Sequence, residues 1–103
     1  MDINLIRNYC NDENIIITQH ALLRLRQKNI KYSDVKNAIL TGDIIEEYPD
    51  DFPYPSCLIS GFGKRERVHL HTVVGINIPS LWIITAYYPT TDKWYDDYKP
   101  RRK

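Results

Sequence analysis

The stretch Arg67-Val-His-Leu-His-Thr-Val-Val-Gly75 decides the fold, because it alternates aliphatic and imidazole side chains with the period of a β-strand. Side chains along a strand point alternately to its two faces. One face carries Val68, Leu70, Val74 and Ile76. The other face carries His69, His71 and Val73. We expect the aliphatic face to build the core and the histidine face to hold chemistry.

Length and composition indicate one small globular domain. The chain has 103 residues, of which 43% are hydrophobic and 26% are charged. These ordinary values exclude disordered, collagen-like and coiled-coil classes. We expect a single domain over residues 1–103, with its core at about 15–98 and a basic tail at 99–103.

The cysteine pattern and the N-terminus favour a cytoplasmic protein. Cys10 and Cys57 lie in different segments and lack the paired spacing of a zinc ribbon or redox motif, so reduced structural thiols are expected. The N-terminus has no signal-peptide pattern. No apolar run approaches the roughly 20 residues that a membrane helix needs.

The net charge of +1 conceals an uneven distribution of charged residues. Acidic residues gather at Asp43–Asp51, whereas basic residues gather at Arg24–Lys31, Lys64–Arg67 and Lys99–Lys103. If the basic groups converge after folding, they suit a short stretch of phosphates. The alternative is a solubility role, which the charge alone favours.

Helices are expected in the first half of the chain and strands in the second. Thr18 should cap a helix over Gln19 to about Lys28, and Ser33 a second helix that ends at Gly42, the two forming an antiparallel pair. Their buried stripes should be Ala21, Leu22 and Leu25 in the first helix and Val35, Ala38 and Ile39 in the second. Weaker patterns predict a short helix over Asp2–Tyr9, a small strand at Ile15–Ile17 and a helical turn within Thr90–Lys103.

The expected fold class is α+β, with N-terminal helices packed on a four-stranded antiparallel sheet. The four strands are expected at Asp43–Tyr48, Ser56–Phe62, Arg67–Asn77 and Leu81–Tyr88. Three prolines keep the Pro49–Pro55 connection out of the sheet. On the last strand, simple alternation places Ile83, Thr85 and Tyr87 on one face and Trp82, Ile84, Ala86 and Tyr88 on the other.

Two groups of polar side chains are candidates for chemistry. His20 and Arg24 lie four residues apart on one helix face, where they either grip a phosphate or form an ordinary solvated face. His71 and His69 share a strand face, and a neutral imidazole moves protons near pH 7 without a metal. The alternatives are a surface pair or a buried, hydrogen-bonded histidine. We find no third ligand at a spacing typical of zinc, so no metal or cofactor is expected.

Several motifs together resemble a known family of small bacterial proteins, the domain of unknown function 4258. The resemblance runs from about Ile16 to Trp94. Its motifs are His20-Ala21-x-x-Arg24, Asp34-Val35, Ala38-Ile39-x-x-Gly42, Ile45-Glu46-x-Tyr48-Pro49, Tyr54-Pro55-Ser56-Cys57-Leu58, Leu70-His71-x-Val73-Val74 and Ile84-Thr85-x-Tyr87-x-Pro89.

The resemblance implies a RelE-like fold, because this family is grouped with RelE-like and MqsR-like ribonuclease toxins. By the same resemblance, His20, Arg24, His71, Thr85 and Tyr87 occupy motif positions, whereas His69 does not. Such toxins cleave RNA without a metal and are neutralised by a small cognate antitoxin protein, often a DNA-binding one.

The expected function is therefore a metal-independent endoribonuclease, the toxin of a toxin–antitoxin pair, in which the 2′-hydroxyl attacks the phosphodiester. The catalytic residues are expected to be His20, Arg24, His71 and Tyr87. The two histidines would divide the base and acid roles, Arg24 would stabilise the phosphorane, and Tyr87 would orient the phosphate or ribose. RNA is expected to contact Thr85, Arg26, Lys93 and Trp94, with Tyr54 a further stacking candidate. The alternative is a non-catalytic RNA-binding or protein-interaction module of the same fold.

Overall fold

The computed structural model describes residues 1–64 and 68–90, and their helices and strands confirm the expected α+β class. Its helices and strands are α1 (Ile3–Asn8), β1 (Ile15–Ile17), α2 (Gln19–Gln27), α3 (Tyr32–Thr41), β2 (Asp43–Tyr48), β3 (Ser56–Phe62), β4 (His69–Asn77) and β5 (Ser80–Tyr87). None of the helices in these residues is long and apolar enough to cross a membrane. The proposed turn within Thr90–Lys103 lies, but for Thr90, outside the described residues, as do Lys93 and Trp94.

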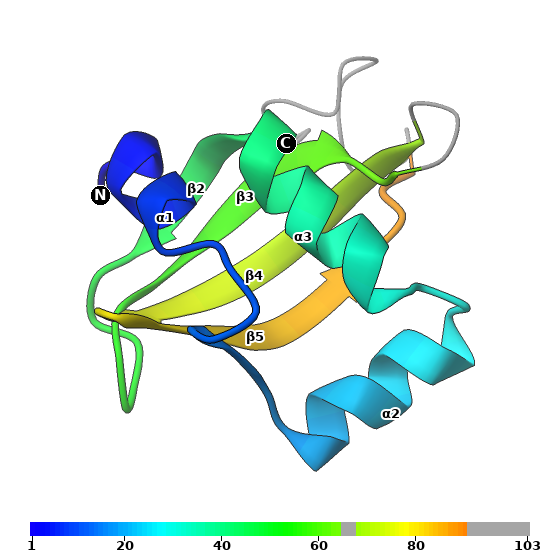
Figure 1. Ribbon diagram of the computed structural model, residues 1–103, viewed down its shortest axis with the longest axis horizontal. Helices are drawn as coiled ribbons and strands as arrows, with labels where there is room; N and C mark the ends of the chain where they lie inside the picture. The colour runs from blue at the N-terminus through cyan, green and yellow to red at the C-terminus, as the bar shows by residue number, and fades with distance from the viewer. Residues whose placement is uncertain (65–67, 91–103) are drawn as a thin grey trace.

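The sheet contains five strands in the order β1-β5-β4-β3-β2 and is mixed (Figure 1). Strands β2 to β5 form the expected antiparallel meander. The expected total of four antiparallel strands is wrong, because β1 adds a fifth strand parallel to β5 and places Ile16 opposite Trp82. Three successive β-branched side chains in β1 favour this extended conformation.

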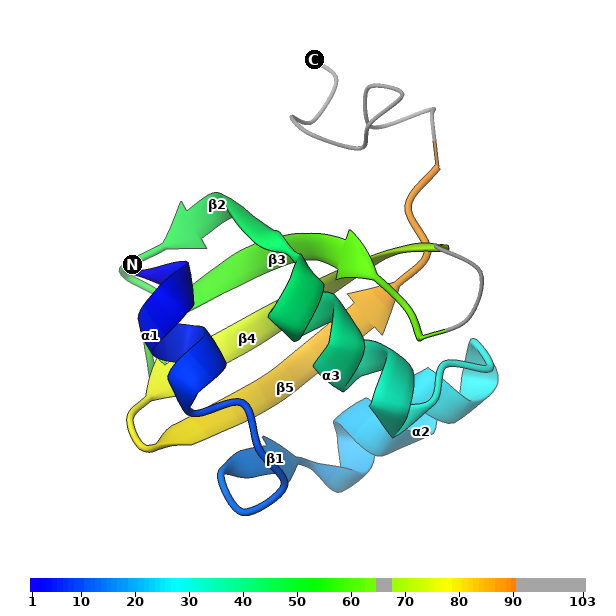
Figure 2. The same cartoon turned by 45° about the horizontal axis from the view of Figure 1, so that its top comes forward.

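One face of the sheet packs against α1 and α3, which lie over it in Figures 1 and 2. The aliphatic face of β4 supplies Leu70 and Val74 to this core, as expected. The buried stripe of α3 is also confirmed, because Val35, Ala38 and Ile39 are at most 1% exposed. At the close approach of α3 to β3, a glycine is required: an added Cβ on Gly61 would lie 2.1 Å from the Ala38 carbonyl oxygen.

Helix α2 lies beside β5, at the edge of the sheet away from β2, and it is apart from α3 (Figure 1). The expected antiparallel helix pair is therefore replaced by two helices that pack on different strands. Ala21 and Leu25 are buried as predicted. The prediction that Leu22 is buried is wrong, because its side chain is 37% exposed. A helix at the edge of a sheet contacts fewer strands than a helix lying across the sheet, so fewer of its side chains are buried.

The helix caps agree with the sequence in α2 and differ in α3. The Thr18 hydroxyl accepts a hydrogen bond from the Ala21 amide at 3.1 Å, as predicted. Ser33 is not a cap, because α3 begins at Tyr32 after Lys31. The buried Asp34 carboxylate instead accepts bonds from the backbone amides of Lys31 at 3.2 Å and Lys64 at 2.9 Å. The Asp34 carboxylate thus satisfies the backbone amide of Lys31, which would otherwise be unpaired at the start of the helix.

A β-bulge in β5 changes which side chains share a face. Val73 lies opposite Thr85 and the next residue, Val74, lies opposite Ile83, so Ile84 is an extra residue in β5. The expected grouping of Ile83 with Thr85 and Tyr87 is therefore wrong. Ile83 and Ala86 face the core together, and the Thr72 hydroxyl donates to the Thr85 carbonyl oxygen at 3.0 Å.

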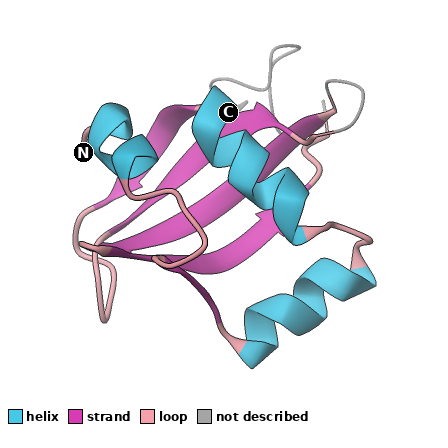
Figure 3. Ribbon diagram, in the orientation of Figure 1, coloured by secondary structure: helices cyan, strands magenta, loops and turns pink. Residues whose placement is uncertain are grey.

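The connection between β2 and β3 projects beyond the end of the sheet as a long loop (Figure 3). Asp51 anchors it, because its carboxylate accepts bonds from the Phe52 amide at 2.9 Å and from the Ser56 hydroxyl at 2.6 Å. The loop carries Phe52 and Tyr54 toward the start of α2, where they line a pocket described below.

Candidate functional site

The centre of the candidate site is a pair of side chains on neighbouring strands. The β4–β5 register places His71 directly opposite Tyr87. The Nδ1 atom of His71 lies 3.3 Å from the Tyr87 hydroxyl oxygen, and the two rings meet edge-on with centroids 5.4 Å apart. His71 is 0% exposed, whereas Tyr87 is half-buried. The pair can therefore exchange a proton, with Tyr87 as the outer member.

Lys28, at the C-terminal cap of α2, joins this pair. Its Nζ atom donates to the Ala86 carbonyl oxygen at 3.4 Å and lies 5.7 Å from the centre of the Tyr87 ring. An ammonium at this distance from an aromatic ring is weakly attracted to its face. These contacts hold a positive charge beside the tyrosine, in what we term the His71–Tyr87–Lys28 cluster.

Ser60 lies on the other side of His71. The β3–β4 register places the two residues directly opposite each other, and Ser60 is 1% exposed. Within the described residues, the Ser60 hydroxyl oxygen is buried and has no hydrogen-bond partner. Directly opposed strand residues have their Cβ atoms about 4.5–5.5 Å apart, so a serine, a histidine and a tyrosine form one row across three strands.

His69 and Thr85 flank the cluster along the strands. His69 lies opposite Phe62, with ring centroids 4.7 Å apart. Thr85 lies opposite Val73, two residues along β4 from His71. The structure thus places Thr85 and Tyr87 on the same side of β5 as the histidine face of β4, an arrangement that the sequence had left open.

His20 lies in a different part of the fold, at the start of α2. It lines a pocket of about 340 Å³, which we term the aromatic pocket. The other described residues around it are Thr18, Phe52, Pro53, Tyr54, Gly75, Trp82, Ile83 and Ile84. His71 is not among them. Gly75 follows His71 by four residues on β4, a separation of about 13 Å along a strand.

Arg24 and Arg26 are exposed on α2 between these two places. A helix rises about 1.5 Å per residue, so the α-carbons of His20 and Lys28 are about 12 Å apart along α2. The structure therefore brings together two of the four predicted catalytic residues, His71 and Tyr87, and adds Lys28. It places His20 at the aromatic pocket and Arg24 midway.

Residues 17–88 match a family described as a domain of unknown function, DUF4258, and these residues make up more than half of the chain. The chain belongs to the DUF4258 family. No curated protein and no solved structure gives a match.

The DUF4258 match contains α2, α3 and the four-stranded meander, and it starts after α1. Lys28, Ser60, His71 and Tyr87 all lie within it. Within residues 1–64 and 68–90, no three His, Cys, Asp or Glu side chains gather as a possible metal site.

Sequence reasoning missed Lys28 and Ser60. Lys28 carries a usable signal, because it continues the spacing of His20 and Arg24 by another four residues along one helix face. Ser60 carries none. Its place beside His71 depends on the register of β3 against β4, which local patterns do not determine.

Proposed function

We propose that this DUF4258 protein is a metal-independent endoribonuclease of the RelE-like kind, a cytoplasmic toxin that a small antitoxin protein neutralises. The observation that carries the proposal is the contact of His71 with Tyr87 beside the Lys28 ammonium. This cluster offers a proton acceptor, a hydroxyl and a positive charge within one site. Cleavage of RNA by its own 2′-hydroxyl requires groups of these three kinds.

In the proposed reaction the 2′-oxygen attacks the adjacent phosphorus. A bond forms between them, the bond from phosphorus to the 5′-oxygen breaks, and the products carry a 2′,3′-cyclic phosphate and a 5′-hydroxyl. A base takes the proton from the 2′-hydroxyl, and an acid gives one to the departing 5′-oxygen. Positive charge stabilises the phosphorane between these steps.

The burial of His71 suggests how these roles are divided. Because the imidazole is 0% exposed, Tyr87 is the member of the pair that touches RNA. The Tyr87 oxygen takes the 2′-proton while its own proton moves to Nδ1 of His71. Lys28 places its ammonium near the phosphorane and can donate a proton to the 5′-oxygen. Arg24 lies one helical turn away and can hold a neighbouring phosphate.

The proposal is tested by incubating the purified protein with single-stranded RNA in excess EDTA. We expect cleavage with 2′,3′-cyclic phosphate ends, and growth arrest when the protein is expressed without its antitoxin. His71→Ala should lower the rate at least about 100-fold, as loss of acid–base catalysis does. His69→Ala is the matched control on the same strand face and should cleave normally. Equal rates for the wild type and His71→Ala, or no cleavage at all, would contradict the proposal.

One observation favours the alternative function, a non-catalytic RNA-binding or protein-interaction module. A histidine that is 0% exposed and lies beside a tyrosine hydroxyl is also a stable way to satisfy a buried polar group. In that case His71→Ala would lower the free energy of unfolding, and the wild-type protein would bind RNA or one protein partner without cleaving RNA.

A further inference from the structure

The aromatic pocket has the size of a small-ligand site. Its volume of about 340 Å³ falls within the range of roughly 300–1,000 Å³ typical of such sites. Four separate parts of the chain build it: the start of α2, the loop between β2 and β3, and the strands β4 and β5. Gly75 leaves the floor open, because this position of β4 has no side chain to fill the space.

The side chains around the pocket suit a flat, uncharged ring. Among its described lining residues, His20 is the only ionisable group other than the tyrosine, and there is no lysine, arginine or carboxylate. The Tyr54 and Trp82 rings lie 5.8 Å apart at an angle of 32°, and Phe52 is 91% exposed beside them. Apolar aromatic walls favour stacking, whereas a phosphate would find no cation among these residues.

The polar groups of the pocket suit a ring that carries hydrogen-bonding atoms. At the rim, the Thr18 hydroxyl accepts from the Ala21 amide and keeps its own proton to donate, and the His20 imidazole can donate or accept.

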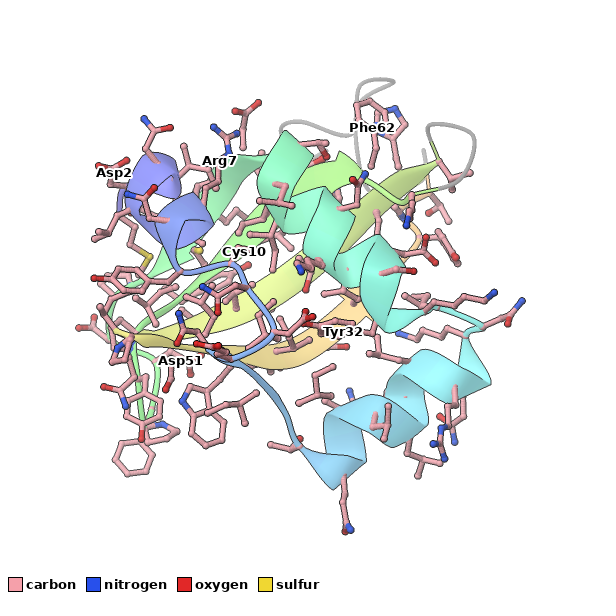
Figure 4. The ribbon with its side chains drawn as sticks, in the orientation of Figure 1. Asp2, Arg7, Cys10, Tyr32, Asp51 and Phe62 are labelled. Atoms are coloured by element: carbon pink, nitrogen blue, oxygen red, sulfur yellow. The ribbon has the colours of Figure 1, made fainter. Side chains whose placement is uncertain are left out.

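We propose that the aromatic pocket binds an unpaired nucleobase of RNA. Stacking on aromatic rings combined with hydrogen bonds to the base edge is how proteins hold single-stranded RNA. This inference rests on the proposed function and adds a substrate subsite to it. The pocket lies beside the β2–β3 loop, which contains Asp51 and leads into the start of β3. His71 pairs with β3 near Phe62, at the other end of that strand, and Figure 4 labels Asp51 and Phe62 at these two ends. The bound base therefore belongs to a neighbouring nucleotide and not to either of the two nucleotides that the cleaved bond joins.

The test measures nucleotide binding and does not depend on cleavage. The chain has two tryptophans, so Trp94→Phe leaves Trp82 as the only fluorescent indole. In this background, adenosine and uridine monophosphates should quench the fluorescence saturably, whereas ribose 5-phosphate, which has no base, should not. Tyr54→Ala should weaken nucleotide binding about tenfold, in line with the loss of one stacking contact. Tyr88→Ala, an exposed tyrosine outside the pocket, is the matched control.

A second variant fills the pocket from its floor. An added Cβ on Gly75 meets its nearest atom, in Trp82, at an ordinary 3.4 Å, so Gly75→Ala should fold and weaken the quenching. Equal quenching by ribose 5-phosphate, tighter binding of indole than of nucleotides, or unchanged affinity in both folded pocket variants would overturn the inference. Cleavage without nucleotide binding rejects the base subsite alone. Nucleotide binding without cleavage keeps the subsite and rejects the nuclease.

Discussion

Tyr87 connects the parts of the candidate site through a single side chain. Its hydroxyl lies 3.3 Å from His71, and its ring lies 5.7 Å from the Lys28 ammonium. Tyr87→Phe keeps the ring and removes the oxygen through which the proton would pass. We expect kcat/KM for RNA cleavage to fall at least about 100-fold, while the free energy of unfolding falls by about 1–3 kcal/mol because the buried His71 loses a hydrogen-bond partner. Tyr88→Phe is the matched control, and a wild-type rate in Tyr87→Phe would show that His71 does not act through this hydroxyl.

Cys57 gives a prediction about pH and stability. Burial, and next the negative charge of Glu47, raises the pKa of the Cys57 thiol to about 12. The unfolded thiol ionises near pH 9, whereas the folded thiol stays neutral up to about pH 12. The free energy of unfolding therefore falls as the pH rises from about 9 to 12, and Cys57 has no effect on it below that range. The expected loss is about 1.4 kcal/mol per pH unit in that range. Urea unfolding at pH 8 and pH 10.5 should show a larger loss for wild type than for Cys57→Ala, and equal losses would contradict the assignment.

At the scale of elements, the contact of α3 with β3 depends on one missing methyl group. An alanine at position 61 would bring its Cβ to 2.1 Å from the Ala38 carbonyl oxygen, so the helix must move away from the sheet. We expect Gly61→Ala to lower the free energy of unfolding by about 1–3 kcal/mol, as overpacking of a core does. Gly75→Ala, whose Cβ meets ordinary contacts, should cost clearly less in the same urea titration. Equal costs would mean that the helix shifts freely.

Local periodicity predicted the elements well and their pairing less well. The bounds of β2 and β3 were predicted to the residue, because alternation and turn residues are written into the chain. The small strand at Ile15–Ile17 was predicted as well, but its parallel pairing with β5 and the bulge at Ile84 were not, since both depend on which strand lies next to which. For the same reason the sequence indicated His71 and Tyr87 as candidates but could not place Ser60 beside them or separate His20 from them.

At the scale of the whole molecule, α2 connects two parts of one surface. Its start lines the aromatic pocket and its C-terminal cap touches Tyr87. Exposed cations lie along the helix between these ends, at Arg24 and Arg26, and Lys28 follows at the cap. The net charge of +1 is thus compatible with RNA binding. A short RNA strand lying along α2 would contact the positive charges of this helix, and the net charge of the whole protein would matter less.

This arrangement predicts how RNA affinity responds to salt. Two cations that share one face of α2 and its cap, Arg24 and Lys28, can neutralise up to two phosphates, and each contributes about −0.7 to the slope of log affinity against log salt for a single strand. We expect a slope of about −1.4, or roughly sevenfold weaker binding at 200 mM than at 50 mM salt, measured with the His71→Ala protein so that RNA stays intact. Lys28→Gln should make the slope shallower by about 0.7. Lys36→Gln is the matched control, because Lys36 lies on α3 and pairs with Asp12 at 3.0 Å. If Lys28→Gln and Lys36→Gln change the slope equally, α2 is not the surface that follows the RNA backbone.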